Sequence, residues 1–209
     1  DDVNAPFVDA NGQTNGKTNG EVYKVKPGNS KYVDVNKDGV YNDADQGIIG
    51  CGQPTFNWGW NNTFNYKNFD FSFFVVGFHG FDIYNATHQM GYNLIKSQQM
   101  AGVTPMRELL NRWTPTNTNT DIPGFVKGGT ENKDFFSTRF VENGSFIKMK
   151  SITLGYTLPE ATCRSLGINN LRVYASVQNP FHITKYSGLD PEATMGSPLV
   201  QGVDWGAYP

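Results

Sequence analysis

The chain has 209 residues and a formal net charge of −2 at neutral pH, so no basic excess indicates binding to nucleic acid or to an anionic membrane surface. Aromatic residues make up 14% of the sequence and charged residues only 17%, and this balance, together with 23 glycines, favours an all-β protein. No apolar stretch approaches the roughly 20 residues of a transmembrane helix.

The start of the chain and its cysteines set two further expectations. The first residues are Asp-Asp-Val-Asn, without an initiator Met or the basic and apolar regions of a signal peptide. We therefore expect the chain to begin after processing or inside a longer polypeptide. Cys51 and Cys163 are too few for a disulfide scaffold, and they are compatible with one bridge or with two free thiols.

The first 45 residues are predicted to form two consecutive loops. Residues 1–33 are rich in Asn, Gly, Lys and Thr and lack periodicity, which is typical of an exposed loop. Residues 34–45, DVNKDGVYNDAD, carry oxygen-bearing side chains at alternate positions, with a spacing similar to that of an EF-hand-type calcium loop. The candidate calcium ligands are Asp34, Asn36, Asp38, the carbonyl oxygen of Val40, Asn42 and Asp45.

This calcium loop departs from an EF-hand in two respects. Asp45 stands where EF-hands usually have Glu, and the sequence before Asp34 does not resemble an entering helix. We therefore predict an isolated loop in which calcium has a structural role and in which Gly39 allows the sharp turn. The alternative is a cluster of Asx turns that binds no metal.

From residue 56 onward, aromatic and polar side chains alternate with a period of two. The alternation covers 56–66 and resumes after a short turn with the sequence YKN. Because successive side chains of a strand point to opposite faces, the pattern predicts a long β-hairpin over 56–78 with one aromatic face. The residues of that face are Phe56, Trp58, Trp60, Phe64, Tyr66, Phe69, Phe71, Phe73 and Val75, interrupted by Asn62.

Residues 79–145 lack this alternation and are predicted to be a long connection. A short amphipathic helix is expected near Pro105–Trp113, followed by a loop with the sequence TPTNTNTDIP. So long a connection within a compact domain is unusual and normally has a functional role.

A second strand pair is predicted over 146–179. Apolar and polar residues alternate on both sides of a turn at 159–170. The phase of the alternation changes near Lys150–Ser151, which we interpret as a β-bulge or as the point where the strand leaves its apolar surroundings. Residues 180–209 are predicted to be a final loop.

Two environments for the apolar faces are open: the core of a soluble sandwich and a lipid bilayer. The predicted strands are about ten residues long, which suits a tilted strand crossing a hydrocarbon layer. The connections alternate between short and long, as in outer-membrane barrels, and the faces opposite the apolar ones carry residues that suit a water-filled lumen. These features favour the membrane barrel over the sandwich.

The number of strands indicates a fragment. A closed transmembrane barrel needs at least about eight strands, and lipid does not satisfy open strand edges. The membrane interpretation therefore predicts an all-β chain that forms part of a large antiparallel barrel with long outer loops and is incomplete on its own.

Several stretches of sequence together carry a family resemblance. They are YVDVNKDGVYNDADQGIIG, PTFNWGWNNTFNYKNFDFSFFVVGFHG, NRWTPTNTNTDIP, STRFVENGSFIKMKSITLGYTLP, LRVYASVQNPFHITKYSGLDPE and GVDWGAYP. In this order and spacing they resemble the C-terminal part of the SusC-like TonB-dependent outer-membrane receptors of Bacteroidota. The resemblance covers the chain from about residue 21 to its end.

The resemblance implies a plugged barrel of about twenty-two strands that imports oligosaccharides or peptides with energy from the TonB complex, under a SusD-like surface lipoprotein that serves as a lid. It implies that 1–33, 79–145 and 180–209 are extracellular loops and that 56–78 and 146–179 are transmembrane. The calcium loop would then be extracellular. The plug, the TonB-binding segment, the earlier strands and a last strand would belong to parts of the receptor outside this sequence.

No arrangement of residues indicates an enzyme. The histidines are scattered, and the carboxylates of the loops have no partner at acid/base spacing; these residues are His79, His88, His182, Asp82, Glu108, Glu131 and Glu142. Trp113, Trp205 and Tyr208 lie in predicted outer loops, where they would stack on sugar rings or contact the lid, or would instead anchor their own loops.

Two other functions compete with a non-catalytic segment of an importer. One is a secreted, calcium-stabilised β-sandwich that binds carbohydrate. The other is a fragment of a secreted glycoside hydrolase, because a catalytic carboxylate pair is not recognisable from one sequence.

Overall fold

The computed structural model describes residues 6–8, 11–18, 26–30, 32–39, 42–92, 105–124, 136–192 and 201–206. The chain divides into two compact units, one of Asp1–Ile49 with Ala86–Phe140 and one of Gly50–Asn85 with Val141–Pro209. The second unit holds the long strands.

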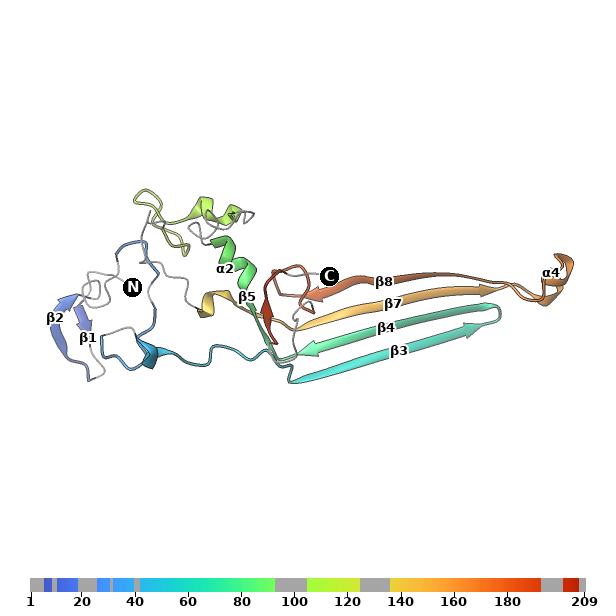
Figure 1. Ribbon diagram of the computed structural model, residues 1–209, viewed down its shortest axis with the longest axis horizontal. Coiled ribbons are helices and arrows are strands. Elements are labelled where there is room, and N and C mark those ends of the chain that lie inside the picture. Colours follow the sequence, from blue (N-terminus) through green and yellow to red (C-terminus); the bar gives the residue numbers. More distant parts are fainter. Residues whose placement is uncertain are drawn as a thin grey trace. The chain divides into compact units, whose positions relative to one another are not determined.

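Four long antiparallel strands form the main sheet of the second unit, in the order β3-β4-β7-β8 (Figure 1). Their bounds are Phe56–Tyr66 for β3, Phe69–His79 for β4, Phe146–Thr157 for β7 and Arg172–Thr184 for β8. The β3–β4 turn and the short helix α4 (Glu160–Ser165), which follows β7, lie at the same end of the sheet. Both predicted strand pairs are confirmed. Among the described residues β3 and β8 are the outer strands, so the sheet is open.

Strand β8 is longer than predicted. It continues to Thr184, whereas the sequence pattern placed its end at residue 179 and assigned 180–184 to a loop. Pro180 lies where the pairing with β7 is irregular, and Asn179 has a positive φ of 47°. Proline is tolerated at such irregularities and on outer strands, so the Asn-Pro sequence does not end this strand.

The register confirms that each strand has two distinct faces. Trp60 pairs with Val75, and Phe71 pairs with Leu154, which in turn pairs with Ala175. Paired residues point to the same side of a sheet, so the alternating residues of all four strands form one continuous surface. We call it the apolar face; its residues are Phe56, Trp58, Trp60, Phe64, Tyr66, Phe69, Phe71, Phe73, Val75, Ile147, Met149, Ile152, Leu154, Tyr156, Val173, Ala175, Val177, Phe181 and Ile183. The opposite side is the polar face.

The predicted change of phase in β7 is a bulge. The pairing shifts by one residue between Phe74 and Val75 of β4, opposite Met149 and Ser151 of β7. Lys150 is the additional residue, which keeps the apolar residues on both sides of it on one face of the sheet.

A smaller sheet lies beyond the other end of the long strands, away from α4 (Figure 1). It has the order β6-β5-β9, with β5 at Asp82–Asn85, β6 at Val141–Asn143 and β9 at Val203–Asp204. β5 pairs antiparallel with β6 and parallel with β9. We call these three strands, together with residues 186–192, the ledge.

The first unit is built from short elements. They are β1 (Pro6–Val8) paired with β2 (Thr14–Thr18), the 3-10 helices η1 (Asp43–Asp45), η2 (Arg107–Asn111) and η3 (Thr138–Phe140), and the helix α2 (Ala86–Tyr92). The helix expected near Pro105–Trp113 is the single 3-10 segment η2. Among the described residues, no helix has the length and apolar character needed to span a membrane.

Candidate functional site

The apolar face is open to its surroundings along its whole length. Trp60 keeps 57% of its surface exposed, Val177 54% and Leu154 51%. The indole of Trp58 lies directly over Gly77 of β4, because glycine leaves room there for a large ring. Such a continuous exposed apolar surface is far larger than soluble monomers present, so this face meets an apolar medium or another part of a larger protein.

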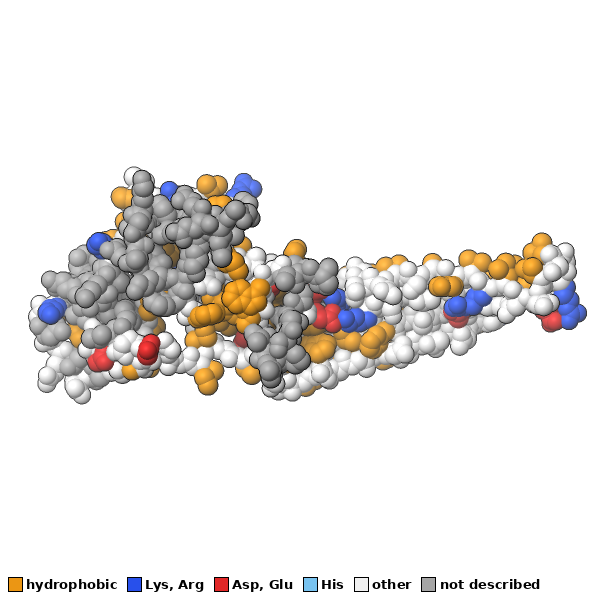
Figure 2. Space-filling model, in the orientation of Figure 1, with side chains coloured by type: hydrophobic (Ala, Val, Ile, Leu, Met, Phe, Trp, Pro, Cys, Tyr) orange, Lys and Arg blue, Asp and Glu red, His pale blue; other side chains and the backbone are white. Residues whose placement is uncertain are grey.

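The polar face carries small hydroxyl and amide side chains over most of its length. Thr153 and Ser176 form a cross-strand hydrogen bond of 2.9 Å between their hydroxyls. In Figure 2 the long strands are largely white on the side shown, with one group of charged side chains beside the ledge and another toward the α4 end. This composition suits a surface in contact with water.

An ion pair bridges three strands of the polar face near the α4 end. Arg172 of β8 donates from Nε to Asp70 Oδ1 at 3.0 Å and from Nη2 to Oδ2 at 2.6 Å. Gly155 of β7 lies beneath this pair, and a Cβ there would collide with both side chains. The missing side chain therefore allows Arg172 to reach Asp70 across β7, and the guanidinium also covers the ring of Tyr174.

The ledge end of the polar face differs from the rest of that face in carrying apolar side chains. Val76, Phe78 and Phe146 point to this side and pack with Ile83 of the ledge and with Phe81, which directly precedes it. The rings of Phe78 and Phe146 are stacked, with centroids 5.1 Å apart. This cluster is the core of the second unit. The signal for it is the run FFVVGF in β4, which is apolar on both faces, as strands buried on both sides are.

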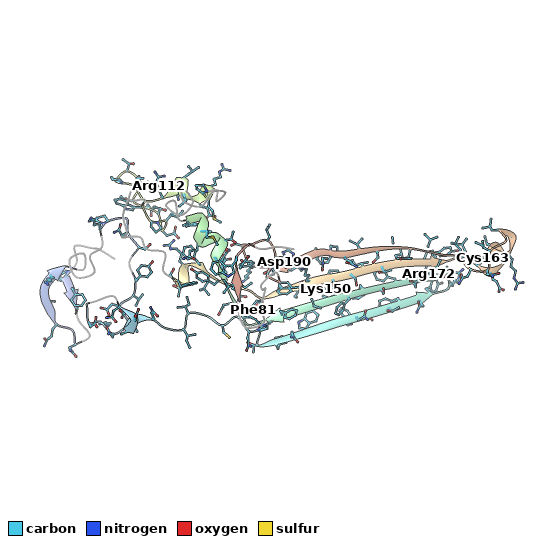
Figure 3. The ribbon with its side chains drawn as sticks, in the orientation of Figure 1. Phe81, Arg112, Lys150, Cys163, Arg172 and Asp190 are labelled. Carbon is cyan, nitrogen blue, oxygen red and sulfur yellow. The ribbon has the colours of Figure 1, made fainter. Side chains whose placement is uncertain are left out.

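Four charged side chains join the ledge to β7. Lys148, with 5% of its surface exposed, donates from Nζ to Asp190 at 2.6 Å and to Glu192 at 2.8 Å. Lys150, the bulge residue, also pairs with Glu192. Figure 3 shows Lys150 and Asp190 at the same end of the sheet, near Phe81. Sequence reasoning missed this network because its partners are 42 to 44 residues apart.

The two acidic members of this network are stabilised in their charged form. Burial alone would raise the pKa of Asp190, but the hydrogen bond from Lys148 and that from the backbone of Glu192 outweigh it, and the pKa is lowered. The pKa of Glu192 is lowered in the same way by Lys148 and Lys150. Both groups are therefore carboxylates at neutral pH.

The predicted calcium loop is closed by its own hydrogen bonds. Asp34 is buried and accepts from the Gly39 backbone N–H at 2.8 Å, so the first carboxylate reaches the turn glycine, which has a φ of 82°. Asp45 accepts from the N–H groups of Val35 at 2.9 Å and Asn42 at 3.0 Å. Val40 lies outside the described residues.

The last carboxylate of the loop is stabilised in its charged form. The pKa of Asp45 is lowered, chiefly by the hydrogen bond from the Asn42 backbone and against the effect of desolvation, with a smaller contribution from the side chain of Asp34. Asn36 accepts from the Asp38 N–H at 3.0 Å. Within the described ranges no three His, Cys, Asp or Glu side chains converge on a common point. The donor set fits a hard cation in which Asn and carbonyl oxygens supply part of the shell.

The candidate ligand-binding aromatics differ in their surroundings. The Trp113 ring covers Gly28 of the 1–33 segment, so it connects two loops of the first unit, and its backbone N–H donates to the Ile122 carbonyl of its own loop at 2.8 Å. Trp205, which directly follows β9, is 56% exposed. Tyr208 lies outside the described residues.

The histidines and loop carboxylates are dispersed. His79 stacks on Phe56, His182 pairs with Lys148 across the sheet, and His88 lies 3.4 Å from Glu108. Tyr92 donates to Glu108 at 2.5 Å, which lowers the pKa of that carboxylate. Burial raises the pKa of Tyr92, and the hydrogen bond to Glu108 and the charge of that carboxylate raise it further.

Two of the remaining carboxylates of the predicted set accept hydrogen bonds within the fold. Asp82 accepts from the Cys51 N–H at 3.1 Å, and Glu142 accepts from Ser187. Glu131 lies outside the described residues. Cys51 and Cys163 are free thiols, so the alternative of a bridge between them is not realised.

Curated relatives identify the family. The chain is 35% identical over 189 residues to TonB-dependent receptor P3 of Formosa agariphila, covering 88% of this chain and 18% of that protein. It is 32% identical over 186 residues to TonB-dependent receptor SusC of Bacteroides thetaiotaomicron, covering 88% of this chain and 17% of that protein. The chain belongs to the SusC-like TonB-dependent receptors.

Solved structures agree with this assignment. A structure of the RagAB peptide transporter matches 73% of this chain and 15% of its own, with 26% identity and a TM-score of 0.59. The RagAB peptide importer in its closed-closed state shares the fold over 84% of this chain, with a TM-score of 0.63. No protein-family model matches the chain. The chain spans about a fifth of the length of these SusC-like relatives, so its open antiparallel sheet is part of a larger barrel.

Proposed function

We propose that the chain forms part of the wall of a SusC-like importer in the outer membrane, with the apolar face toward lipid and the polar face toward the lumen. The observation that carries this proposal is the pairing of one continuous exposed apolar surface with an opposite surface of hydroxyl, amide and charged groups. A soluble β-sandwich needs a second sheet over the apolar face, and none of the described elements covers it. The relatives are named as receptors, which also disfavours the hydrolase alternative.

The proposed ligand is an oligosaccharide or a peptide. RagAB is described as a peptide transporter, and the resemblance to SusC-like receptors extends the class to oligosaccharides. Trp205, an exposed residue directly after β9 of the ledge, would contact such a ligand or a SusD-like lipoprotein lid, because a flat indole stacks on a sugar ring or on an apolar side chain. Trp113 and Tyr208 are further candidates for the same role.

The wall contributes no chemistry in this mechanism. It supplies a hydrated path for the ligand, while the plug and the TonB complex, which belong to the rest of the receptor, open that path. Backbone groups of the long strands pair with one another, so the wall leaves few unpaired polar groups toward lipid, and only the outer edges of β3 and β8 require neighbouring strands.

Purification of the tagged receptor from outer membranes tests this proposal. The expected result is a complex that contains the full barrel and one surface lipoprotein. Cells in which TonB is deleted are expected to lose uptake of the oligosaccharide or peptide mixture on which the host grows. Recovery of the chain as a secreted, water-soluble module would contradict the proposal.

We also propose that the loop 34–45 binds one structural calcium ion. Asp34, Asn36, Asp38, Asn42, Asp45 and the carbonyl of Val40 would supply hard oxygen ligands, and the ion would hold the two terminal carboxylates together. The matched control for this site is Asp43, which lies in the same loop but outside the ligand spacing and contacts Gln46.

Calcium titration of the metal-stripped receptor by calorimetry tests the calcium proposal. Asp34→Asn is expected to weaken calcium binding at least tenfold, whereas Asp43→Asn leaves it unchanged. Equal effects of the two substitutions, or the absence of calcium binding in the unmodified receptor, would favour the metal-free Asx-turn alternative.

A further inference from the structure

The ledge lies at the end of the sheet away from α4, where it packs against residues of the polar face. We propose that the ledge is a fixed constriction of the pore: it projects into the lumen at the outer end and keeps its position relative to the wall while ligand passes. This inference rests on the proposed function, because the polar face borders a pore only in a barrel.

Among the residues that the structure describes, the ledge packs against the polar side of the wall. Val76, Phe78 and Lys148, through which the sheet holds it, all point to the polar face. The apolar side chains that alternate with them, such as Val75 and Met149, belong to the opposite face. An element held in this way narrows the pore that the polar face would line.

The covalent connections between the ledge and the wall are short. β4 passes into β5 through residues 80–81, β6 passes into β7 through residues 144–145, and β8 passes into Tyr186 through one intervening residue. These connections are also hydrogen-bonded to one another. Gly80 N–H donates to Ser145 Oγ at 3.1 Å, and the Thr184 hydroxyl donates to the Ser145 carbonyl at 3.0 Å.

Polar contacts tie the parts of the ledge together. Glu142 of β6 accepts from the N–H and hydroxyl of Ser187 at 2.8 and 2.7 Å, and from Asn85 of β5 at 2.9 Å. Asp204 of β9 is almost fully buried and accepts from the hydroxyl of Tyr186 at 2.5 Å. The three strands and residues 186–192 are therefore one body.

A moving gate requires a hinge, which is a segment that absorbs a large change of backbone angles. The connections of the ledge offer little length for such a change, and its contacts with the wall combine an aromatic cluster with the ion pairs of the buried Lys148. Mobile elements normally have few buried contacts and exposed backbone hydrogen bonds. The ledge has the opposite properties, so we infer that it moves with the wall.

Distances between spin labels in the full-length receptor test this inference. One label is placed on the ledge by Leu189→Cys, an exposed position outside its anchors, and one at the β3–β4 turn by Lys67→Cys, in a receptor that carries Cys51→Ser. The control pair combines Lys67→Cys with Ile183→Cys, an exposed position within β8 of the wall. Distances are measured in lipid nanodiscs with and without the purified periplasmic domain of TonB.

A fixed ledge predicts one narrow distance for the Lys67–Leu189 pair in both conditions, or a change that the control pair shares. A second distance or a broader distribution that only the Leu189 pair shows would overturn the inference. Failure of the proposed function would be distinct from either outcome, because the receptor would then be missing from outer-membrane preparations before labelling.

Discussion

Lys148 is a buried cation whose charge is balanced by residues from a distant segment. Its two carboxylate partners, Asp190 and Glu192, keep partial access to water, while Lys148 itself has almost none. Removal of one member of such a network leaves the remaining charges unpaired in a poorly hydrated site. The free-energy cost of these unpaired charges is larger than the net stabilisation by the intact pair.

We predict that Lys148→Met loosens residues 186–192 on the wall. The expected cost is about 3 kcal/mol, the lower end of the range for breaking a buried ion pair, because the two carboxylates keep some hydration. Hydrogen exchange of the full receptor measures it as faster exchange over 186–192. The exposed Lys185→Met is the control and should leave exchange unchanged; similar effects of both substitutions would contradict the role of the network.

The same network predicts a dependence on pH. The pKa values of Asp190 and Glu192 are lowered in the folded chain from their ordinary values of 3.8 and 4.5. Their contribution to stability is therefore complete above about pH 4.5 and is lost as the pH falls through the lowered values. Exchange protection of 186–192 should fall selectively below pH 4.5, after correction for intrinsic rates. In Lys148→Met this selective fall should be strongly reduced, and an equal fall in both proteins would count against the assignment.

At the scale of single elements, Gly155 marks a constraint on strand β7. A Cβ at this position would point at the ion pair of Asp70 and Arg172, which crosses β7 there. Added volume there must displace a side chain that has a paired charge, and overpacking of this kind costs about 1–3 kcal/mol.

We therefore predict that Gly155→Ala destabilises the barrel by about 1–3 kcal/mol. Gly47→Ala is the control, because nothing lies near the position of its Cβ. Urea unfolding of the receptor in lipid vesicles measures both. A Gly155→Ala receptor as stable as the Gly47→Ala receptor would show that the pair adapts without loss.

The sequence predicts these elements to different degrees. β3 is recognisable because its alternation is local and nearly strict. The spacing of the calcium loop is also local, and calcium binding there stays a prediction. The ledge was not predicted, since β4 is apolar on both faces near it and the contacts of Lys148 and Glu142 are formed by residues far apart in the sequence. The end of β8 was misplaced at residue 179, because local sequence does not show that an irregular pairing with β7 accommodates Pro180.

At the scale of the whole molecule, the chain exposes strand edges and an apolar surface that the rest of the receptor must cover. β3 and β8 each have an outer edge that no described strand pairs, and the apolar face between them is uncovered. Open edges and large apolar surfaces promote association in water.

We predict that the 209-residue chain alone does not form a compact monomer in detergent-free buffer. Size-exclusion chromatography with light scattering should show aggregates or no soluble material, and the chain should become dispersed when it is refolded with detergent. A monodisperse, compact monomer in plain buffer would instead support the soluble sandwich.

The orientation of the two faces is the central claim, and spin labels on consecutive residues of β8 test it most directly. Single cysteines at positions 173 to 178 of the full receptor are labelled in outer-membrane vesicles, and collisions with oxygen, which partitions into lipid, and with a water-soluble nickel complex are compared. We predict maximal oxygen contact at Val173, Ala175 and Val177, and maximal nickel contact at Tyr174 and Ser176. A reversed alternation, or equal contact at neighbouring positions, would contradict the account.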